Sequence, residues 1–229
     1  RVTILKDVKN YIPNDDTIYN LMLESKEYQK IKKSVEKYRL NVVNLWNKKI
    51  SEQLNKIIRQ DISDYTVYLV DNRLDTIEIP TVSNKPVNIL ILGKELPKTE
   101  PNKLIILILD KILKTELNIY KKTDSIIANA IIELAIQNEI ATILSNTSHY
   151  WLGNEKLISI KRQIYPFWLM YLGVKEEDLI KYMNRDKIAF DTTKFPYNKN
   201  LANLDISGFI DFCITNKKSI IREEQLELI

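Results

Sequence analysis

The chain of 229 residues contains one histidine, one cysteine and only four glycines. The glycines are far apart, so no loop can offer consecutive backbone amides to a phosphate group. This excludes the glycine-rich loops of Rossmann folds, P-loop proteins and kinases. Cys213 alone can form neither an internal disulfide nor a paired-cysteine metal site, and His149 alone cannot supply the imidazoles of an ordinary zinc enzyme.

The composition is nevertheless that of an ordinary globular protein. Hydrophobic residues make up 45% of the chain and charged residues 28%, which argues against disorder. No uninterrupted apolar run is longer than the one at 104–109, which is much shorter than the roughly 20 residues that span a bilayer. The N-terminal residues show no signal pattern. We therefore expect no membrane span and a cytoplasmic protein, or an intravirion one if its source is viral.

Hydrophobic spacing predicts an α+β fold that is mostly helical. No repeat or low-complexity linker interrupts the chain, which favours a single domain over 1–229. Its expected parts are N-terminal helices at 15–60, a small strand region at 65–92, two consecutive buried helices within 103–144, and a helical C-terminal part at 155–229.

Particular residues predict where some of these elements begin and end. Asp15 and Asp16 are expected helix caps, and a long amphipathic helix is expected to begin near Arg39. Pro80 cannot donate to a sheet ladder and indicates an edge strand. Gly93 is expected to end the last strand of the region.

One N-terminal segment is rich in lysine. The formal net charge of the whole chain is only +4, and nucleic-acid binders usually concentrate basic residues on one face. Glutamates interleave with the lysines, which favours a solvated surface helix, although a nucleic-acid site stays open as an alternative. The segment contains Lys26, Lys30, Lys32, Lys33 and Lys37, together with Glu24, Glu27 and Glu36.

The order of helices, strands with an edge hairpin, and two buried helices resembles the core of the zincin metallopeptidases. In that family the first buried helix carries His-Glu-x-x-His, because residues four apart share a helical face and can bind one zinc. The apolar segment at 104–114 is similar to that helix. Aligned by its apolar pattern, the motif positions fall on Asp110, Lys111 and Lys114.

The resemblance implies a gluzincin-type core without its zinc site. Asp110 replaces the first His, Lys111 the Glu and Lys114 the second His, and protonated lysine has no lone pair for a metal. In that branch the next helix supplies a third ligand, and Glu133 and Glu139 occupy this region. We therefore expect no catalytic residue, no metal and no cofactor. Alternatively, Asp110 and Lys114 are simply an ion pair one helical turn apart.

The carboxylates of Asp110, Glu133 and Glu139 could still act through a hard cation. Glu133 and Glu139 are six residues apart, which separates them by about 120° on an α-helix. At most one is then expected to face the first buried helix, with Lys111 or Lys114 as its ion-pair partner.

These patterns leave three hypotheses about function. The leading one is a non-catalytic binding or structural protein derived from a zincin-like fold, with a protein as its partner. The alternatives are a nucleic-acid-associated protein that uses the lysine-rich helices, and a carboxylate-dependent hydrolase with a hard cation. His149 is expected to be an ordinary loop residue, and Cys213 a buried thiol on the last helix.

Overall fold

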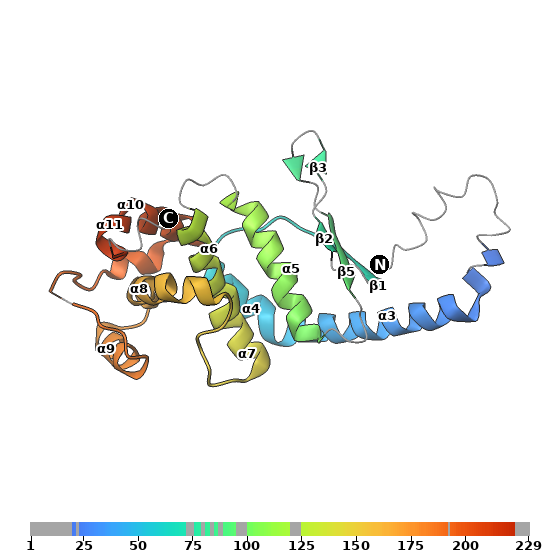
Figure 1. Ribbon diagram of the computed structural model, residues 1–229, viewed down its shortest axis with the longest axis horizontal. Helices are drawn as coiled ribbons and strands as arrows, with labels where there is room; N and C mark the ends of the chain where they lie inside the picture. Colours follow the sequence, from blue (N-terminus) through green and yellow to red (C-terminus); the bar gives the residue numbers. More distant parts are fainter. Residues whose placement is uncertain are drawn as a thin grey trace. The chain divides into compact units, whose positions relative to one another are not determined.

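The computed structural model describes residues 20–21, 23–71, 76–78, 81–82, 85–86, 89–94, 100–119, 125–191 and 193–222 (Figure 1). The chain is mostly helical, as predicted. It divides into two compact units, which we call the sheet unit (Arg1–Ile50 and Ile62–Ile112) and the helical unit (Ser51–Asp61 and Leu113–Ile229). The single domain expected from the sequence stays a prediction, and the expected caps Asp15 and Asp16 lie outside the described residues.

The sheet unit contains a long amphipathic helix, α3 (Lys26–Leu45). Ser25 caps it, because its side chain accepts a hydrogen bond from a first-turn amide. The break expected near Arg39 is wrong: Arg39 lies within α3 and pairs with Glu36 across one turn at 2.6 Å. The helix continues into a π-helical turn, Trp46–Ile50.

The strands form two small sheets, and their bounds differ from the prediction. The first sheet has the order β1-β5-β2, with β1 parallel and β2 antiparallel to β5, and β3 pairs with β4 in the second. Gly93 does not end a strand: it lies within β5, where its backbone pairs with Val70 and Thr76. Pro80 lies outside the described residues. The strands are β1 (Thr66–Asp71), β2 (Thr76–Glu78), β3 (Thr81–Val82), β4 (Lys85–Pro86) and β5 (Ile89–Lys94).

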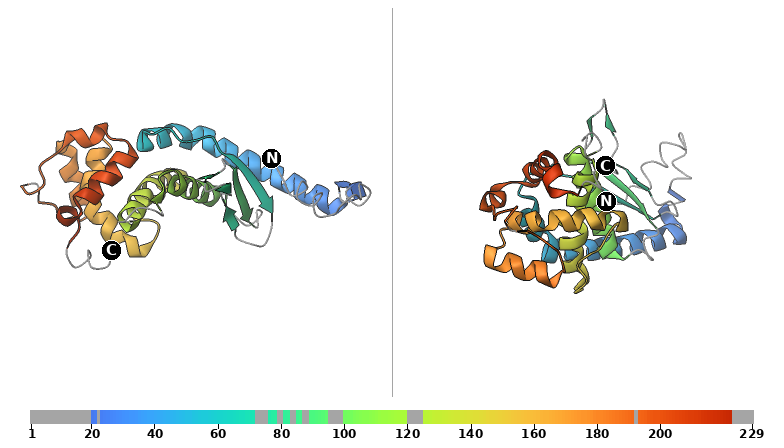
Figure 2. Two further views of the ribbon diagram at one scale, coloured as in Figure 1. Left: turned by 90° about the horizontal axis from the view of Figure 1, so that it is seen from above. Right: turned by 60° about the vertical axis from the view of Figure 1, so that its left-hand side comes forward.

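The core of the sheet unit lies between α3 and α5 (Pro101–Glu116). Proline is well suited to the first position of α5, where its missing N–H costs no hydrogen bond. The strands lie beside α3, whose N-terminal part extends beyond them (Figures 1 and 2). The core residues are Val35, Tyr38, Leu104, Ile108 and Ile112, with Val42, Ile62, Tyr65 and Val67 packed against them.

The helical unit is built around α8 (Glu155–Tyr171), most of whose second half is buried. Trp168 stacks on Tyr171, and both rings pack against Phe209. Cys213 is buried as predicted, and burial raises the pKa of its thiol. The other helical elements are α4 (Ser51–Ile58), α6 (Ser125–Glu133), the π-helix η4 (Leu134–Ile140), α7 (Ala141–Ser145), α9 (Glu176–Arg185), the 3₁₀ turn η5 (Lys199–Asn203), α10 (Ile206–Thr215) and α11 (Lys217–Ile220).

Two side chains fasten the end of α4 to the rest of the helical unit. The Tyr171 hydroxyl donates to the carbonyl oxygen of Ile57. Arg59 follows α4 and has a φ of 53°, which is outside the helical region. Its guanidinium donates to the carbonyl oxygen of Ala202 at 2.6 Å and lies 4.5 Å from the centre of the Tyr171 ring. These contacts join segments more than a hundred residues apart in the sequence.

One described helical run, Ser125–Ser145, is long and apolar enough to cross a membrane by length and composition. In this structure 61% of its most apolar window is buried. Buried core helices of soluble proteins share these properties, so the absence of a membrane span stays a prediction.

Candidate functional site

The three motif positions of the zincin resemblance all lie on α5. Asp110 and Lys111 belong to the sheet unit and Lys114 to the helical unit, and each is half-buried. The neighbouring Leu109 and Leu113 are each 1% exposed. The prediction that this helix is buried is therefore confirmed, whereas its relation to a zinc-binding helix stays a prediction.

Glu133 contacts a lysine that is completely buried. Lys161, on α8, is 0% exposed, and its Nζ lies 3.0 Å from Oε2 of Glu133. The same Nζ donates to Oδ1 of Asn138 at 3.3 Å and to the carbonyl oxygen of Leu152 at 2.5 Å. An ammonium group has three N–H donors, so these three acceptors satisfy it fully.

The π-helical turn η4 makes this arrangement possible. Glu133 and Asn138 are five residues apart, and in an α-helix they would lie about 140° from one another. A π-helix forms i to i+5 hydrogen bonds and so brings residues five apart to the same face. Both side chains thereby reach Lys161.

The same polar groups hold the loop between α7 and α8. Oε2 of Glu133 accepts from the backbone N–H of Asn154 at 3.0 Å, and Nδ2 of Asn138 donates to the carbonyl oxygen of Tyr150 at 2.5 Å. Gly153 has a φ of +90°, and a Cβ at this position would lie 2.6 Å from Oε2 of Glu133. Only glycine fits this position without a shift of the loop or of Glu133.

Glu139, six residues after Glu133, has different partners. Its Oε1 accepts hydrogen bonds from the Tyr150 hydroxyl and, at 3.0 Å, from Nε1 of Trp168. Burial raises the pKa of Glu139, although the two hydrogen bonds and the charge of Arg185 act in the opposite direction. Burial and the neighbouring carboxylate also raise the pKa of Tyr150 well above its ordinary value. Because its pKa is raised, the Tyr150 hydroxyl keeps its proton and donates it in the hydrogen bond to Glu139.

An aromatic cluster packs the loop against α8. The rings of Tyr150, Trp151 and Tyr165 lie 5.1 to 5.4 Å apart, and the guanidinium of Arg162 lies 5.2 Å from the Trp151 ring. Burial and Asp186 raise the pKa of Tyr165. The cluster gives the loop an apolar contact with α8 in addition to its polar ones.

The cation beside Glu133 is Lys161, so the predicted pairing of a glutamate with Lys111 or Lys114 is wrong for this residue. Glu133 and Glu139 do not share a partner, yet both form hydrogen bonds with α8. Within the part of the chain that the structure describes, no group of three or more His, Cys, Asp or Glu side chains could hold a metal ion.

His149 lies in the same loop, as predicted. Its side chain is exposed, and its backbone N–H donates to the hydroxyl of Thr147 at 3.1 Å. The geometry gives it the ordinary loop role expected from the sequence.

Sequence reasoning missed Lys161 as the centre of the polar network. Ile164, Tyr165 and Trp168 lie three, four and seven residues after it, so Lys161 lies on the apolar stripe of α8. A lysine on such a stripe is a detectable signal of a buried pair. The π-helical turn that directs Asn138 has no comparable signal in the sequence.

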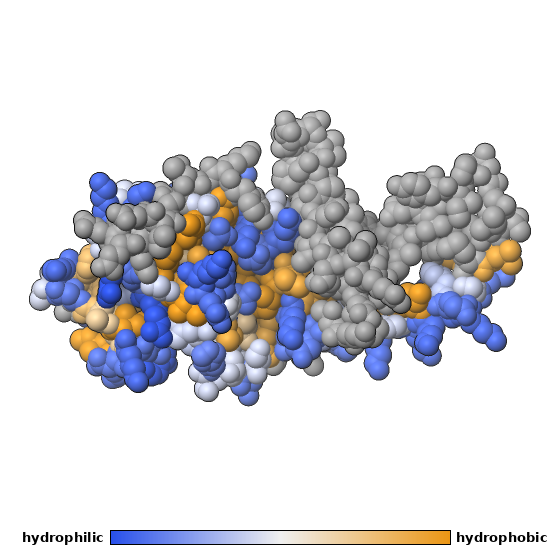
Figure 3. Space-filling model, in the orientation of Figure 1, coloured by the Kyte–Doolittle hydropathy of each residue, from blue (hydrophilic) through white to orange (hydrophobic). Residues whose placement is uncertain are grey.

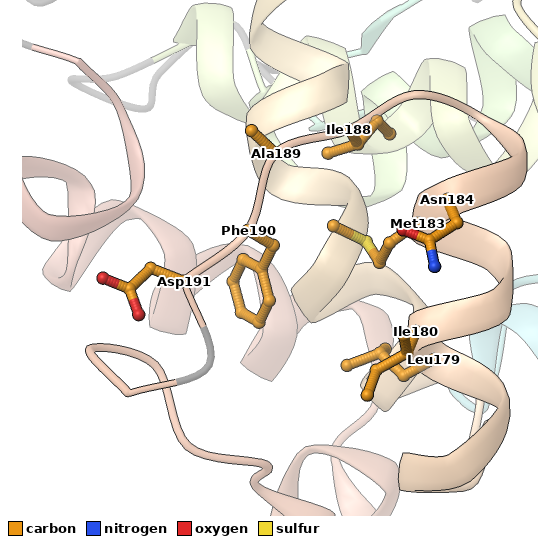
Figure 4. A pocket seen from close by; sticks show the side chains of 8 residues that line it. All are labelled: Leu179, Ile180, Met183, Asn184, Ile188, Ala189, Phe190 and Asp191. Atoms are coloured by element: carbon orange, nitrogen blue, oxygen red, sulfur yellow. The ribbon is translucent and has the colours of Figure 1, made fainter.

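The described part of the helical unit also has an open apolar groove beside α9, with a volume of about 540 Å³ (Figure 4). Leu179 and Met183 are buried there, whereas Ile180 is 52% exposed. The residues lining it are Leu179, Ile180, Met183, Asn184, Ile188, Ala189, Phe190 and Asp191.

Comparison of the chain with family models, with curated proteins and with solved structures finds no match in any of the three. The zincin resemblance therefore rests on the order of elements and on α5 alone.

Proposed function

We propose that the chain is a non-catalytic binding protein whose fold derives from a zincin-like peptidase core, and that its partner is a protein. One observation carries this proposal: the carboxylates of Glu133 and Glu139 each accept hydrogen bonds from two donors of the chain itself. A general base must reach the proton of a substrate or a water molecule. A carboxylate whose contacts position a loop and a helix is suited to stabilising the fold instead.

The helix α5 supports the zincin-derived part of the proposal. It follows a mixed sheet whose strand β2 is an antiparallel edge strand, and α6 follows it, in the order expected of that family. Asp110 and Lys114 lie one turn apart on it. Lysine cannot ligate zinc at neutral pH, so α5 has the place in the order of elements that the zinc-binding helix of a zincin would have, but not its zinc ligands.

The groove beside α9 supports a protein as the partner. Its lining is mostly apolar, with Asn184 and Asp191 as its polar members. The exposure of Ile180 beside it is of the kind that contact with another protein's apolar side chain would remove.

The first test is elemental analysis of the protein after incubation with excess zinc and exhaustive dialysis. We expect no stoichiometric zinc, because the motif positions provide one carboxylate and two ammonium groups. One tightly held zinc per chain would contradict the non-catalytic assignment.

The second test restores the motif in the triple variant Asp110→His, Lys111→Glu, Lys114→His. If α5 derives from a zinc-binding helix, this variant should hold one zinc per chain, more tightly than a bare histidine pair. Glu177→His with Lys181→His provides the control, since both residues are exposed on α9 and four residues apart. Equal zinc affinity of the two folded variants would reject the zincin origin.

A further inference from the structure

The excess positive charge of the chain is concentrated on α3. This helix contains six basic and two acidic side chains, a formal charge of +4. The whole chain, with 34 basic and 30 acidic residues, also has a formal charge of +4. The formal charges of the rest of the chain therefore sum to zero. The net charge of +4 belongs to α3, which is strongly basic.

Four of these lysines form a straight row, which we call the lysine ridge. At 100° per residue, spacings of four, three and four residues keep them within about 60° of one another over about 16 Å of helix. The buried Val35 lies on the opposite side of α3, so the ridge faces away from the core. Figure 3 shows hydrophilic side chains along α3. The ridge consists of Lys26, Lys30, Lys33 and Lys37, all of them exposed.

The interleaved glutamates do not neutralise the ridge. Glu36 is held by Arg39, through contacts of 2.6 and 3.0 Å, and this pairing lowers its pKa. Glu27 projects about 90° from the ridge by helical geometry. Among the described residues, no ion pair involves a ridge lysine. The solvated mixed-charge surface expected from the sequence thus contains a row of uncompensated ammonium groups.

From this row we propose that the lysine ridge binds the phosphate backbone of double-stranded nucleic acid without reading its sequence. Each strand of a duplex presents one charge per about 3.4 Å of axis, so the ridge spans about five phosphates. Lysine binds phosphate as a point charge and lacks the planar guanidinium with which arginine makes paired hydrogen bonds. The proposal goes beyond the protein partner proposed above, because it concerns the other unit.

A membrane surface fits the ridge less well. Helices that lie on membranes place large apolar side chains beside their cations. Ile31 is the exposed apolar residue within the span of the ridge, and it projects toward the buried side of α3, about 130° from the ridge. Binding to the phosphates of a duplex requires only the positive charges and no apolar side chains.

The test compares two variants with the same change in net charge. The ridge variant replaces the four ridge lysines by glutamine, which preserves helix propensity. The control variant replaces four exposed lysines of the helical unit by glutamine: Lys156, Lys187, Lys194 and Lys218. Circular dichroism of both variants checks that the helices are retained.

Fluorescence anisotropy would measure affinity for labelled DNA and RNA duplexes of about 20 base pairs, between about 50 and 200 mM salt. For the intact chain we expect the logarithm of affinity to fall with the logarithm of salt concentration with a slope of about −3 to −4, for any sequence. The ridge variant should bind at least about tenfold more weakly at low salt, and each single substitution should reduce the slope by about 1. The control variant should bind like the intact chain.

Three outcomes would overturn the proposal. The first is the absence of duplex binding by the intact chain at low salt. The second is an equal loss of affinity in the ridge and control variants, which would show that net charge alone matters. The third is ridge-dependent binding to vesicles of anionic phospholipid that exceeds binding to the duplexes, which would identify a membrane as the partner.

Discussion

Lysine has opposite environments in the two units of this protein. Lys161 of the helical unit is completely buried, and three acceptors satisfy its ammonium group. The lysines of the ridge are exposed, and none has an ion-pair partner among the described residues. The same side chain therefore contributes to the fold in one unit and leaves charge available to a partner in the other.

The difference follows from position on the helix. Lys161 lies on the apolar stripe of α8, where an ammonium group survives only with acceptors around it. The ridge lies opposite the core residue Val35, where water solvates each charge at no cost. We expect the effect of a substitution on stability to decrease from the first environment to the second.

The largest effect is expected for Lys161→Met. The methionine fits the apolar stripe of α8, but it leaves the Glu133 side chain, which is only 12% exposed, without its cation and Asn138 without a donor. Breaking a buried pair in this way should lower the free energy of unfolding by about 3 to 5 kcal/mol. Equilibrium unfolding in urea measures this change in the free energy of unfolding. The control is Lys156→Met at an exposed position, which should change the free energy of unfolding by no more than about 0.5 kcal/mol.

A second substitution distinguishes the effect of the uncompensated carboxylate from the effect of the changed side-chain shape. Adding Glu133→Gln to Lys161→Met removes the uncompensated carboxylate, so the double variant should be more stable than Lys161→Met alone. If Lys161→Met costs no more than Lys156→Met, the network does not stabilise the helical unit, and the contrast between the two kinds of lysine fails.

The two units also differ in how much of their structure could be predicted from the sequence. Local patterns correctly predicted that a helical part of the chain begins at 155, where α8 begins, and that Cys213 is buried. The lysines of α3 and their spacing were also visible in the sequence, but the glutamates between them favoured a mixed-charge surface, and the pairing of Glu36 with Arg39 was not predicted. Features that depend on distant segments were missed.

The partner of Glu133 shows why. It is 28 residues away, on α8, and nothing near Glu133 in the sequence selects Lys161 over the closer Lys111 or Lys114. The partners of Asn138, Tyr150 and Lys161, also lie outside the π-helical turn, 12 and 23 residues away in the sequence. The sequence therefore predicted that one glutamate would pair with a lysine, but it did not identify Lys161 as that lysine.

An intermediate effect, dependent on pH, is expected at Glu139. Burial raises the pKa of this carboxyl above its ordinary value of 4.5 in the folded chain. Above pH 4.5 the unfolded chain releases the proton while the folded chain retains it. Stability contributed by the protonated group is thus complete below this pH and is lost as the pH rises through the folded pKa, by about 1.4 kcal/mol per pH unit.

Glu139→Gln removes this dependence and retains an acceptor for Tyr150 and Trp168. The free energy of unfolding of the native chain, minus that of the variant, should therefore fall with rising pH and then level off. Urea unfolding at a series of pH values measures it. Glu52→Gln is the opposite case, because Lys56 lowers the pKa of Glu52 and its small contribution is lost as the pH falls. A difference at Glu139 that rises with pH would show that its hydrogen bonds outweigh its burial.

The smallest effect on stability is expected for the ridge variant, although its effect on duplex binding is expected to be large. Lysines three and four residues apart on a helix repel one another, so their replacement by glutamine should leave the melting temperature unchanged or raise it slightly. Any increase should vanish at high salt, because exposed charges are screened. Thermal unfolding at low and high salt measures both. A melting temperature clearly below that of the control variant would show that the ridge stabilises α3, and its lysines would then differ from Lys161 only in exposure and not in role.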